Sequence, residues 1–358
     1  MRKGTSLLPL HYGSAPRWLF ERMVKLSREI ILAISGDFGA EDLLERLSDP
    51  YWFQAFGCAL GFDWHSSGLT TTVCGAIKEA LRDIGGDLGL YAAGGKGATS
   101  RKTPDEIENI IERRAVCLDA QKFIYASRMS AKVDNTALQD GYQLYHHSFL
   151  FSKSGAWAVI QQGMNPKTRW ARRYHWLGSH VRDFVNEPEK AICCDCKNEV
   201  FNMVAKESEN ARRDTARLSG EKPDILINEI EKVSQLKLPR EHELFFGNLR
   251  KASLRKILLS TYEKKPDTFE RLLGIQGVGP KTIRSLALLS ELIYDSKVSR
   301  EDPVKYSFAH GGKDGHPYPI ERSHYDSSIA ILKKALNEAK LGRSDKKNAF
   351  KRLATHNF

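Results

Sequence analysis

Two apolar helical segments lie on either side of a very short glycine-containing link, and this feature restricts the fold more than any other. The stretch reads LLGIQGVGPKTIRSLALLSELI over residues 272–293. Gly277 and Gly279 permit backbone angles that are closed to other residues, and Pro280 suits the first turn of a following helix. Because the link is so short, the two helices must fold back on each other. The pattern predicts a helical hairpin over residues 267–293.

This pattern resembles the helix-hairpin-helix, a motif that clamps the DNA backbone. With no side chains at the two glycines, a phosphate can approach the turn closely. The unpaired N–H groups at the start of the second helix also favour an anion. We therefore expect Gly277, Gly279 and Thr282 to contact DNA. The alternative is a turn that only joins two core helices.

The charge balance of the chain also favours a polyanionic partner. Its 358 residues carry a net charge of +11, and the isoelectric point is about 9.2. Such a balance fits nucleic acid, although it does not say which polyanion is bound. The sequence contains no apolar run long enough to span a membrane and no signal-peptide pattern at its start, so we expect a cytoplasmic protein.

Two further basic segments are candidates for DNA contact. The first is a glycine loop just before an expected helix, and the second interleaves cations with aromatic residues that could stack on bases. Their alternatives are an ordinary solvated loop and a helix with aromatic residues in the core. The candidate residues are Lys96, Arg101 and Lys102 in the first segment, and Arg169, Arg172 and Arg173 in the second.

The sequence predicts an α+β fold that is predominantly helical. Residues 142–151 and 156–162 read as strands joined by the short segment 152–155, and this spacing is typical of a β-hairpin. From about residue 198 onward the apolar spacing is helical. We therefore expect a mixed N-terminal domain over residues 1–190 with a β-hairpin, and a helical domain over residues 191–358.

Taken end to end, the chain resembles a prokaryotic family known only as domain of unknown function 763. The resemblance brings no established chemistry with it. It is carried by the stretches LPLHYGSAPRWLF, LSDPYWFQAFGCALGFDWHSSGLTTTV, YAAGGKGATSRKTP, YASRMSAKVDNTALQDGYQLYHHSFLF, WAVIQQGMNP, RRYHWL and YSFAHGGKDGHPYP.

A second, local resemblance is to the hairpin of bifunctional DNA glycosylases, whose lysine attacks the deoxyribose. That resemblance implies Lys281 as the nucleophile and Asp302 as its electrostatic partner. Lys281 could instead contact a phosphate only. A reserve nucleophile is Lys132, with Asp134 as its partner, although these two residues could also form a surface ion pair. Either lysine would form a Schiff base with an abasic sugar, and elimination would then cut the strand.

This lyase chemistry needs no cofactor and no metal. Cys193 and Cys196 have metal-ligand spacing, but no second cysteine pair follows, so we expect no zinc site. We expect the partner to be duplex DNA with an abasic site. Two alternatives remain open. One is a DNA-binding scaffold without activity, and the other is a metal-dependent nuclease that uses Asp63, Asp134 and Asp140.

Overall fold

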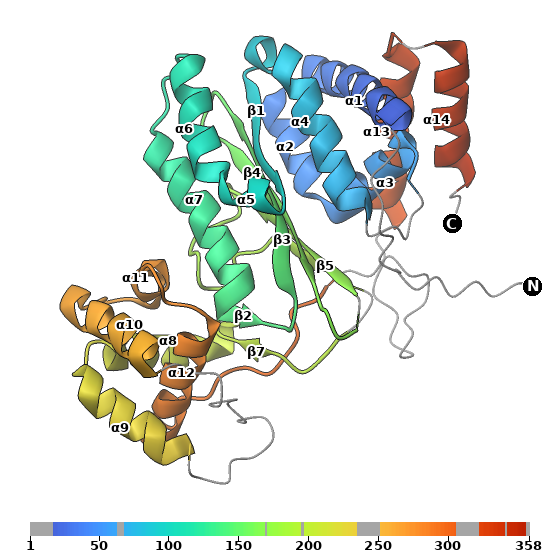
Figure 1. The fold of residues 1–358 in the computed structure, drawn as a ribbon. Helices are drawn as coiled ribbons and strands as arrows, with labels where there is room; N and C mark the ends of the chain where they lie inside the picture. Colours follow the sequence, from blue (N-terminus) through green and yellow to red (C-terminus); the bar gives the residue numbers. More distant parts are fainter. Residues whose placement is uncertain are drawn as a thin grey trace, which may run out of the picture.

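The computed structural model describes residues 17–62, 68–168, 170–194, 197–234, 251–305, 322–340 and 342–355. A twisted antiparallel sheet stands at the centre, with helices on both of its faces (Figure 1). A group of helices from the C-terminal half of the chain extends from one end of this arrangement. The fold is therefore α+β and predominantly helical, as predicted.

The central sheet has five strands in the order β1-β3-β4-β5-β6, and every neighbouring pair is antiparallel. A separate pair, β2 and β7, lies beside it. The strands are β1 (Leu90–Lys96), β2 (Leu138–Gln139), β3 (Gln143–Ser152), β4 (Trp157–Met164), β5 (Ala171–Leu177), β6 (Ala191–Cys193) and β7 (Phe201–Asn202). The predicted β-hairpin is confirmed as β3 and β4, in which Phe151 lies opposite Trp157.

Alternation along the strands creates two hydrophobic cores. Phe149 and Phe151 of β3 face one core, whereas Leu150 between them faces the other. The same alternation separates Val159 of β4 from Ile160. Successive side chains of a strand point to opposite faces, so every central strand is buried on both sides.

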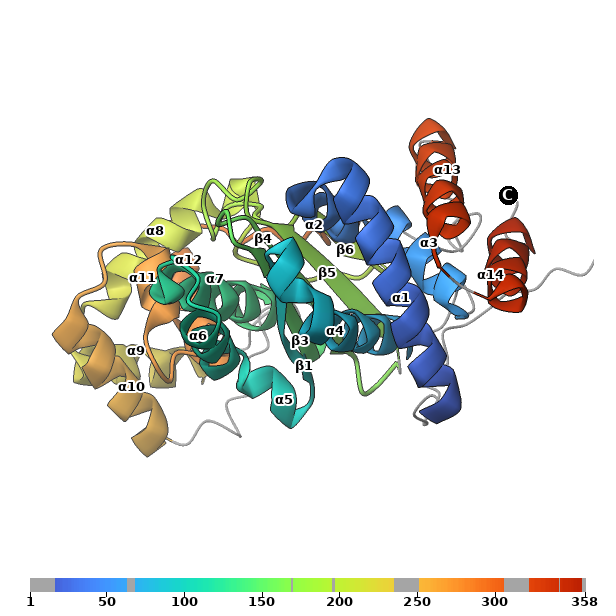
Figure 2. The same ribbon diagram turned by 90° about the horizontal axis from the view of Figure 1, so that it is seen from above.

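One face of the sheet is covered by the N-terminal helices together with the last two helices of the chain. Figure 2 shows α1 and α4 over this face, with α13 and α14 at the outer edge. These helices are α1 (Arg17–Phe38), α2 (Ala40–Ser48), α3 (Pro50–Leu60), α4 (Gly68–Leu88), α13 (Arg322–Glu338) and α14 (Arg343–Thr355). None of the helices in the described part of the chain is long and apolar enough to cross a membrane.

The opposite face is covered by α5 (Ala98–Arg101), α6 (Thr103–Arg113) and α7 (Ala120–Lys132). A π-helical turn, Val133–Ala137, follows α7 directly and leads into β2. Such turns often occur at functional sites. Helix α7 runs along the sheet and ends beside the C-terminal group of helices (Figure 1).

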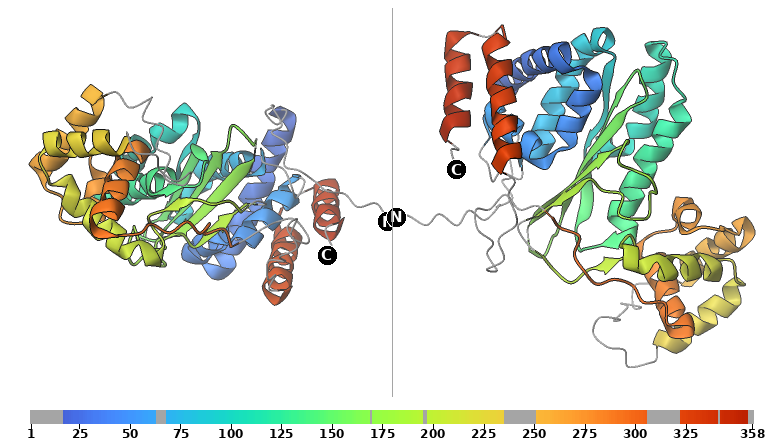
Figure 3. Two further views of the ribbon diagram at one scale, coloured as in Figure 1. Left: turned by 90° about the horizontal axis from the view of Figure 1, so that it is seen from below. Right: turned by 180° about the vertical axis from the view of Figure 1, so that it is seen from behind.

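In the described residues, that group comprises a short 3₁₀ turn, Lys206–Ser208, and five helices. Figure 3 shows it at the end of the molecule opposite α13 and α14. Its helices are α8 (Glu209–Ser219), α9 (Pro223–Ser234), α10 (Lys251–Lys264), α11 (Phe269–Gly274) and α12 (Pro280–Tyr294).

The structure does not divide into two domains at residue 190. Strand β6 lies beyond that position and yet pairs with β5 in the central sheet. Helix α13 packs against α1 and α3, far from the other C-terminal helices. One hydrophobic core also continues from Tyr91 to Val304. The expected boundary is therefore not confirmed, because the chain returns twice to elements formed by its first half.

Candidate functional site

The segment predicted as a helical hairpin contains α11, a turn over residues 275–279, and α12, and its pairing as a helix-hairpin-helix stays a prediction. The turn is held by Ile275 and Val278, which are both buried in the core. Gly277 is exposed and has a φ of 90°, in the left-handed region that glycine occupies without strain. Pro280 begins α12, so the first amides of this helix have no intrahelical partner. We call residues 275–279 the hairpin turn.

Side chains from the first half of the chain hold this turn in place. The ammonium of Lys132, at the end of α7, donates a hydrogen bond to the carbonyl oxygen of Val278. Gln139 of β2 donates from Nε2 to the carbonyl oxygen of Pro280 at 2.9 Å. The fold therefore brings Lys132 to the same turn that precedes Lys281.

The two candidate lysines differ in their surroundings. Lys132 is half-buried, and burial lowers its pKa from the ordinary value because it penalises the charged form. Lys281 is exposed in the first turn of α12. Thr282, beside it, is only 3% exposed. We expected this residue to contact DNA, but its side chain is not accessible at the turn.

Asp134 does not pair with Lys132, contrary to the sequence prediction. Its carboxyl group is fully buried under the sheet, where Oδ2 accepts hydrogen bonds from Gln161 Nε2 and from Trp176 Nε1 at 2.9 Å. The π-helical turn thus directs Asp134 inward, whereas Lys132 points to the hairpin turn.

The bond to Asp134 starts an oriented chain of buried polar groups. Gln161 donates its amide to Asp134, so its Oε1 accepts from His147 Nδ1 at 2.8 Å. His147 Nε2 then accepts from the Ser127 hydroxyl at 2.9 Å. Burial lowers the pKa of His147 to about 4, so the ring is neutral at physiological pH. Ser127 is also buried, and the chain therefore fastens α7 to the sheet.

Asp134 also faces Glu189, which precedes β6. Asp134 Oδ1 and Glu189 Oε1 are both buried, and among the described residues no N–H or O–H group donates a hydrogen bond to either oxygen. Burial and the neighbouring Glu189 raise the pKa of Asp134 well above its usual range, and burial also raises the pKa of Glu189. Two adjacent buried carboxyl groups do not both ionise near neutral pH, so this pair holds a proton.

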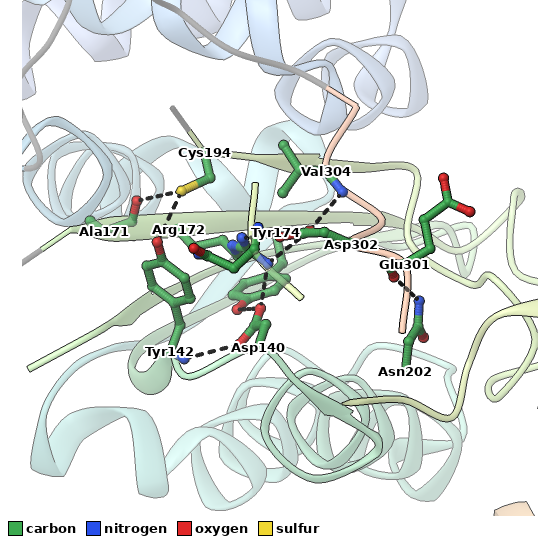
Figure 4. A network of polar contacts seen from close by, with 11 residues as sticks. Asp140, Tyr142, Ala171, Arg172, Tyr174, Cys194, Asn202, Glu301, Asp302 and Val304 are labelled. Atoms are coloured by element: carbon green, nitrogen blue, oxygen red, sulfur yellow. Dashed lines mark hydrogen bonds and ion pairs between the residues drawn. The ribbon is translucent and has the colours of Figure 1, made fainter. Parts of the chain in front are cut away.

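Arg172 lies at the centre of a second buried network (Figure 4). Its guanidinium contacts Asp140 at 2.9 Å and Asp302 at 2.8 Å, and it lies over the ring of Tyr142. Burial alone would lower the pKa of Arg172, but the two carboxylates raise it well above the ordinary value. Tyr174 completes the network by donating to Asp140 at 2.7 Å.

These contacts overturn two predictions. Arg172 is 0% exposed, so it does not contact DNA phosphates. Asp302 is committed to Arg172 and also accepts from the amides of Asn198 and Val304, so it is not the partner of the exposed Lys281. The network instead fastens the segment that follows α12 to the central sheet.

Arg173 is also buried, at 6% exposure, on the other face of β5. It donates to Gln54 Oε1 at 3.0 Å and to His175 Nε2 at 2.8 Å. It therefore does not bind phosphate either. Within the run of cations and aromatic residues that suggested a DNA surface, Arg172 and Arg173 belong to the central strand β5. Their side chains point to opposite faces of the sheet. Arg169 lies outside the described residues.

A scan against known families matches the model described as "Protein of unknown function (DUF763)" to residues 4–320. The chain belongs to the DUF763 family. Searches of curated proteins and of solved structures found no match to this DUF763 protein. Its family membership therefore adds no assigned chemistry to the geometry above.

The remaining basic candidates of this DUF763 protein are accessible. Lys96 ends β1, Arg101 ends the short helix α5, and Lys102 precedes α6. All three side chains are exposed. They lie on the part of the molecule that carries α5 and α6, away from the hairpin turn, and their role in DNA binding stays a prediction (Figure 1).

The acidic and thiol groups that suggested a metal are engaged elsewhere. Asp134 and Asp140 belong to the two buried networks, and burial raises the pKa of the Cys193 thiol to about 12. Within the described ranges, no group of three histidine, cysteine, aspartate or glutamate side chains could hold a metal ion. Asp63 and Cys196 lie outside those ranges.

One exposed basic and aromatic surface on α7 was not among the predicted site residues. Lys122, Tyr125 and Arg128 are all exposed on α7 and recur every three residues, so they share a face with Lys132. The three-residue spacing in the sequence indicates a shared helical face. Only the folded chain shows that this face belongs to α7, whose end contacts the hairpin turn.

Proposed function

We propose that this DUF763 protein binds DNA at the hairpin turn and cleaves the strand at abasic sites without a metal, through a Schiff base on Lys132. The observation that carries the proposal is the position of the Lys132 amine. It is half-buried, its pKa is lowered by that burial, and it touches the turn that resembles a DNA clamp. Lys132 thereby replaces Lys281 as the preferred nucleophile.

The chemistry uses the neutral amine. Its lone pair attacks the C1′ aldehyde of the open abasic sugar, water leaves, and a protonated imine forms between Nζ and C1′. The imine makes the C2′ proton acidic. Solvent water takes that proton, the freed electron pair forms a double bond between C2′ and C3′, and the phosphate leaves with the electron pair of the C3′–O bond. A neutral amine can still donate one N–H to Val278, which leaves the lone pair free to point elsewhere.

The hairpin turn would hold the phosphate beside the sugar. The first amides of α12 and the positive end of its dipole favour an anion, and exposed Gly277 presents no side chain that would block it. Lys281, exposed in the same helical turn, adds a cation. We therefore assign Lys281 to phosphate binding rather than to bond cleavage.

A second candidate function is DNA binding without chemistry. It is favoured by the same hydrogen bond, because a lysine that donates to Val278 also joins α7 to the hairpin turn. In that case Lys132 would be a structural tie, and the protein would act as a scaffold on DNA. Salt-sensitive binding would then occur without any covalent adduct.

The test is a cleavage assay on a duplex with a single abasic site, carried out in EDTA with and without borohydride. The proposal expects strand cleavage and a reduced covalent adduct with wild type and with Lys281→Gln. It expects neither product with Lys132→Gln. Lys281→Gln should instead reduce the slope of log affinity against log salt by roughly 0.9. Lys25, which is exposed on α1, supplies the matched control. Lys25→Gln should leave the slope of log affinity against log salt unchanged.

Binding without an adduct in wild type would leave the scaffold as the better account. An adduct that persists in Lys132→Gln and disappears in Lys281→Gln would instead restore the assignment that the local resemblance implied.

A further inference from the structure

An aromatic groove opens beside the N-terminal half of α7. It has a volume of about 500 Å³, which lies within the roughly 300–1,000 Å³ typical of ligand pockets. Its walls come from α7, from the first residue of β4, and from the loop that follows β5. The residues that form it include Lys122, Tyr125, Trp157, Gly178, Val181 and Phe184.

Three aromatic rings in contact with one another line this groove. Tyr125 is 43% exposed, and its ring meets Phe184 edge-to-face at 5.6 Å between centroids. Phe184 stacks in turn on Trp157, with the two planes parallel and the centroids 6.2 Å apart. An exposed tyrosine backed by stacked rings is unusual for a surface that meets only water, because large apolar area is normally buried.

The backbone around the groove is shaped to keep the rings in place. A Cβ atom added at Gly178 would lie 2.6 Å from Nε1 of Trp157. Only glycine at this position therefore lets the indole lie across the chain that leaves β5. The hydroxyl of Tyr125 also donates a hydrogen bond to the carboxylate of Glu270 on α11, while the ring itself packs on Phe184.

The groove includes a residue of the α7 face that also carries Lys132. Tyr125 and Lys132 are seven residues apart on α7, which places them on one face about 10 Å apart along the axis. Both bond to the helical hairpin, Tyr125 to α11 and Lys132 to the hairpin turn. Exposed Lys122 and Arg128 flank the tyrosine on that face, so cations accompany the ring along the helix.

We propose that the aromatic groove binds an unpaired base of DNA, stacked on Tyr125, next to the strand position held by the hairpin turn. Rings between cations are the arrangement that holds single-stranded nucleic acid, because bases stack on the rings while the cations follow the phosphates. The net charge of +11 complements the same ligand. This inference rests on the proposed DNA binding, not on the lyase step. It makes gapped or single-stranded DNA the preferred substrate class.

The experiment uses the full chain and a duplex with a short gap that contains 2-aminopurine, whose fluorescence falls when it stacks. Wild type should quench the probe and bind the gapped duplex more tightly than the intact one. Tyr125→Leu should abolish the quenching and weaken gapped-duplex binding by roughly tenfold, with intact-duplex binding unchanged. Tyr125→Phe should preserve the quenching, because it keeps the ring and loses only the bond to Glu270. Trp18→Leu, at an exposed ring on α1, is the matched control and should also preserve it.

A second variant acts without changing any ring. Gly178→Ala should displace the Trp157 indole and reduce quenching while leaving Tyr125 in place. Two results would overturn the stacking site. One is persistent quenching in Tyr125→Leu, and the other is an equal loss of affinity for gapped and intact duplex in that variant. Intact-duplex binding without quenching in wild type would defeat this inference alone. No binding to either duplex would defeat the proposed function as well.

Discussion

The side-chain ammonium of Lys132 donates a hydrogen bond to the carbonyl oxygen of Val278, across 146 residues of sequence. This contact joins the C-terminal end of α7 to the hairpin turn. It also shields the amine from water on one side. The contact therefore locates the proposed nucleophile, while burial of the amine, not the hydrogen bond, lowers the pKa of Lys132.

The first prediction concerns the protonation of this amine. Because burial lowers the pKa of Lys132 below the ordinary 10.5, its neutral form should appear at lower pH than that of an exposed lysine. The measurement is the pH dependence of labelling by an amine-reactive reagent, followed by mass spectrometry at Lys132 and at exposed Lys25. The midpoint for Lys132 should lie lower. Equal midpoints would remove the argument for Lys132 as the nucleophile.

The second prediction concerns the Arg172 network. Arg172→Met would leave the carboxylates of Asp140 and Asp302 buried without their cation, which typically costs about 3–5 kcal/mol. Urea unfolding should show this loss. The control is Arg255→Met, which removes an exposed pair with Asp224 and should cost less than about 1 kcal/mol. If both variants were equally stable, the network would not fasten the fold.

A third prediction follows from the proton held by Asp134 and Glu189. A carboxyl group with a raised folded pKa binds its proton more tightly in the folded state. Its stabilising contribution is therefore complete below the unfolded pKa of about 4 and is lost as pH rises through the folded pKa.

Asp134→Asn should accordingly gain unfolding free energy relative to wild type as the pH rises above about 4, since an amide cannot ionise. The asparagine can still accept from Trp176 and donate to Glu189. Exposed Asp224→Asn is the control, and its pH profile should follow wild type. A wild-type profile that rises with pH over this range, with no difference in Asp134→Asn, would contradict the shared proton.

The fourth prediction concerns the geometry of the hairpin turn. Gly277→Ala should destabilise the turn by about 1–2 kcal/mol, because φ is 90° there and an L side chain resists that conformation. DNA binding should weaken with it. Gly274→Ala is the matched control, since a Cβ added there meets nothing within 4 Å. Equal DNA affinity in the two variants would argue against the turn as the binding element.

Local patterns in the sequence were sufficient to predict several elements. The β3–β4 hairpin followed from two strand-like runs joined by a short turn, and helices α11 and α12 followed from apolar stretches on either side of Gly277 and Gly279, whereas their helix-hairpin-helix arrangement stays a prediction. Both depend on neighbours that are close in sequence. The mixed, predominantly helical fold follows from the same local signals.

Long-range pairing explains what was missed. Arg172 and Arg173 looked like surface cations because their partners are distant: Asp302 is 130 residues away from Arg172, and Gln54 is 119 residues away from Arg173. A strand with two buried cations cannot be distinguished from a basic surface until those partners are known. Lys132 and the hairpin turn were both candidates, but only the folded chain brings them together.

The most direct test of the central claim is to find which residue carries the sugar. The protein is incubated with abasic duplex, reduced with borohydride, digested with trypsin and analysed by mass spectrometry. The account predicts the reduced deoxyribose on Lys132, in the peptide spanning residues 129–153. Modification of Lys281, in the peptide spanning residues 272–284, or no modified peptide at all, would contradict it.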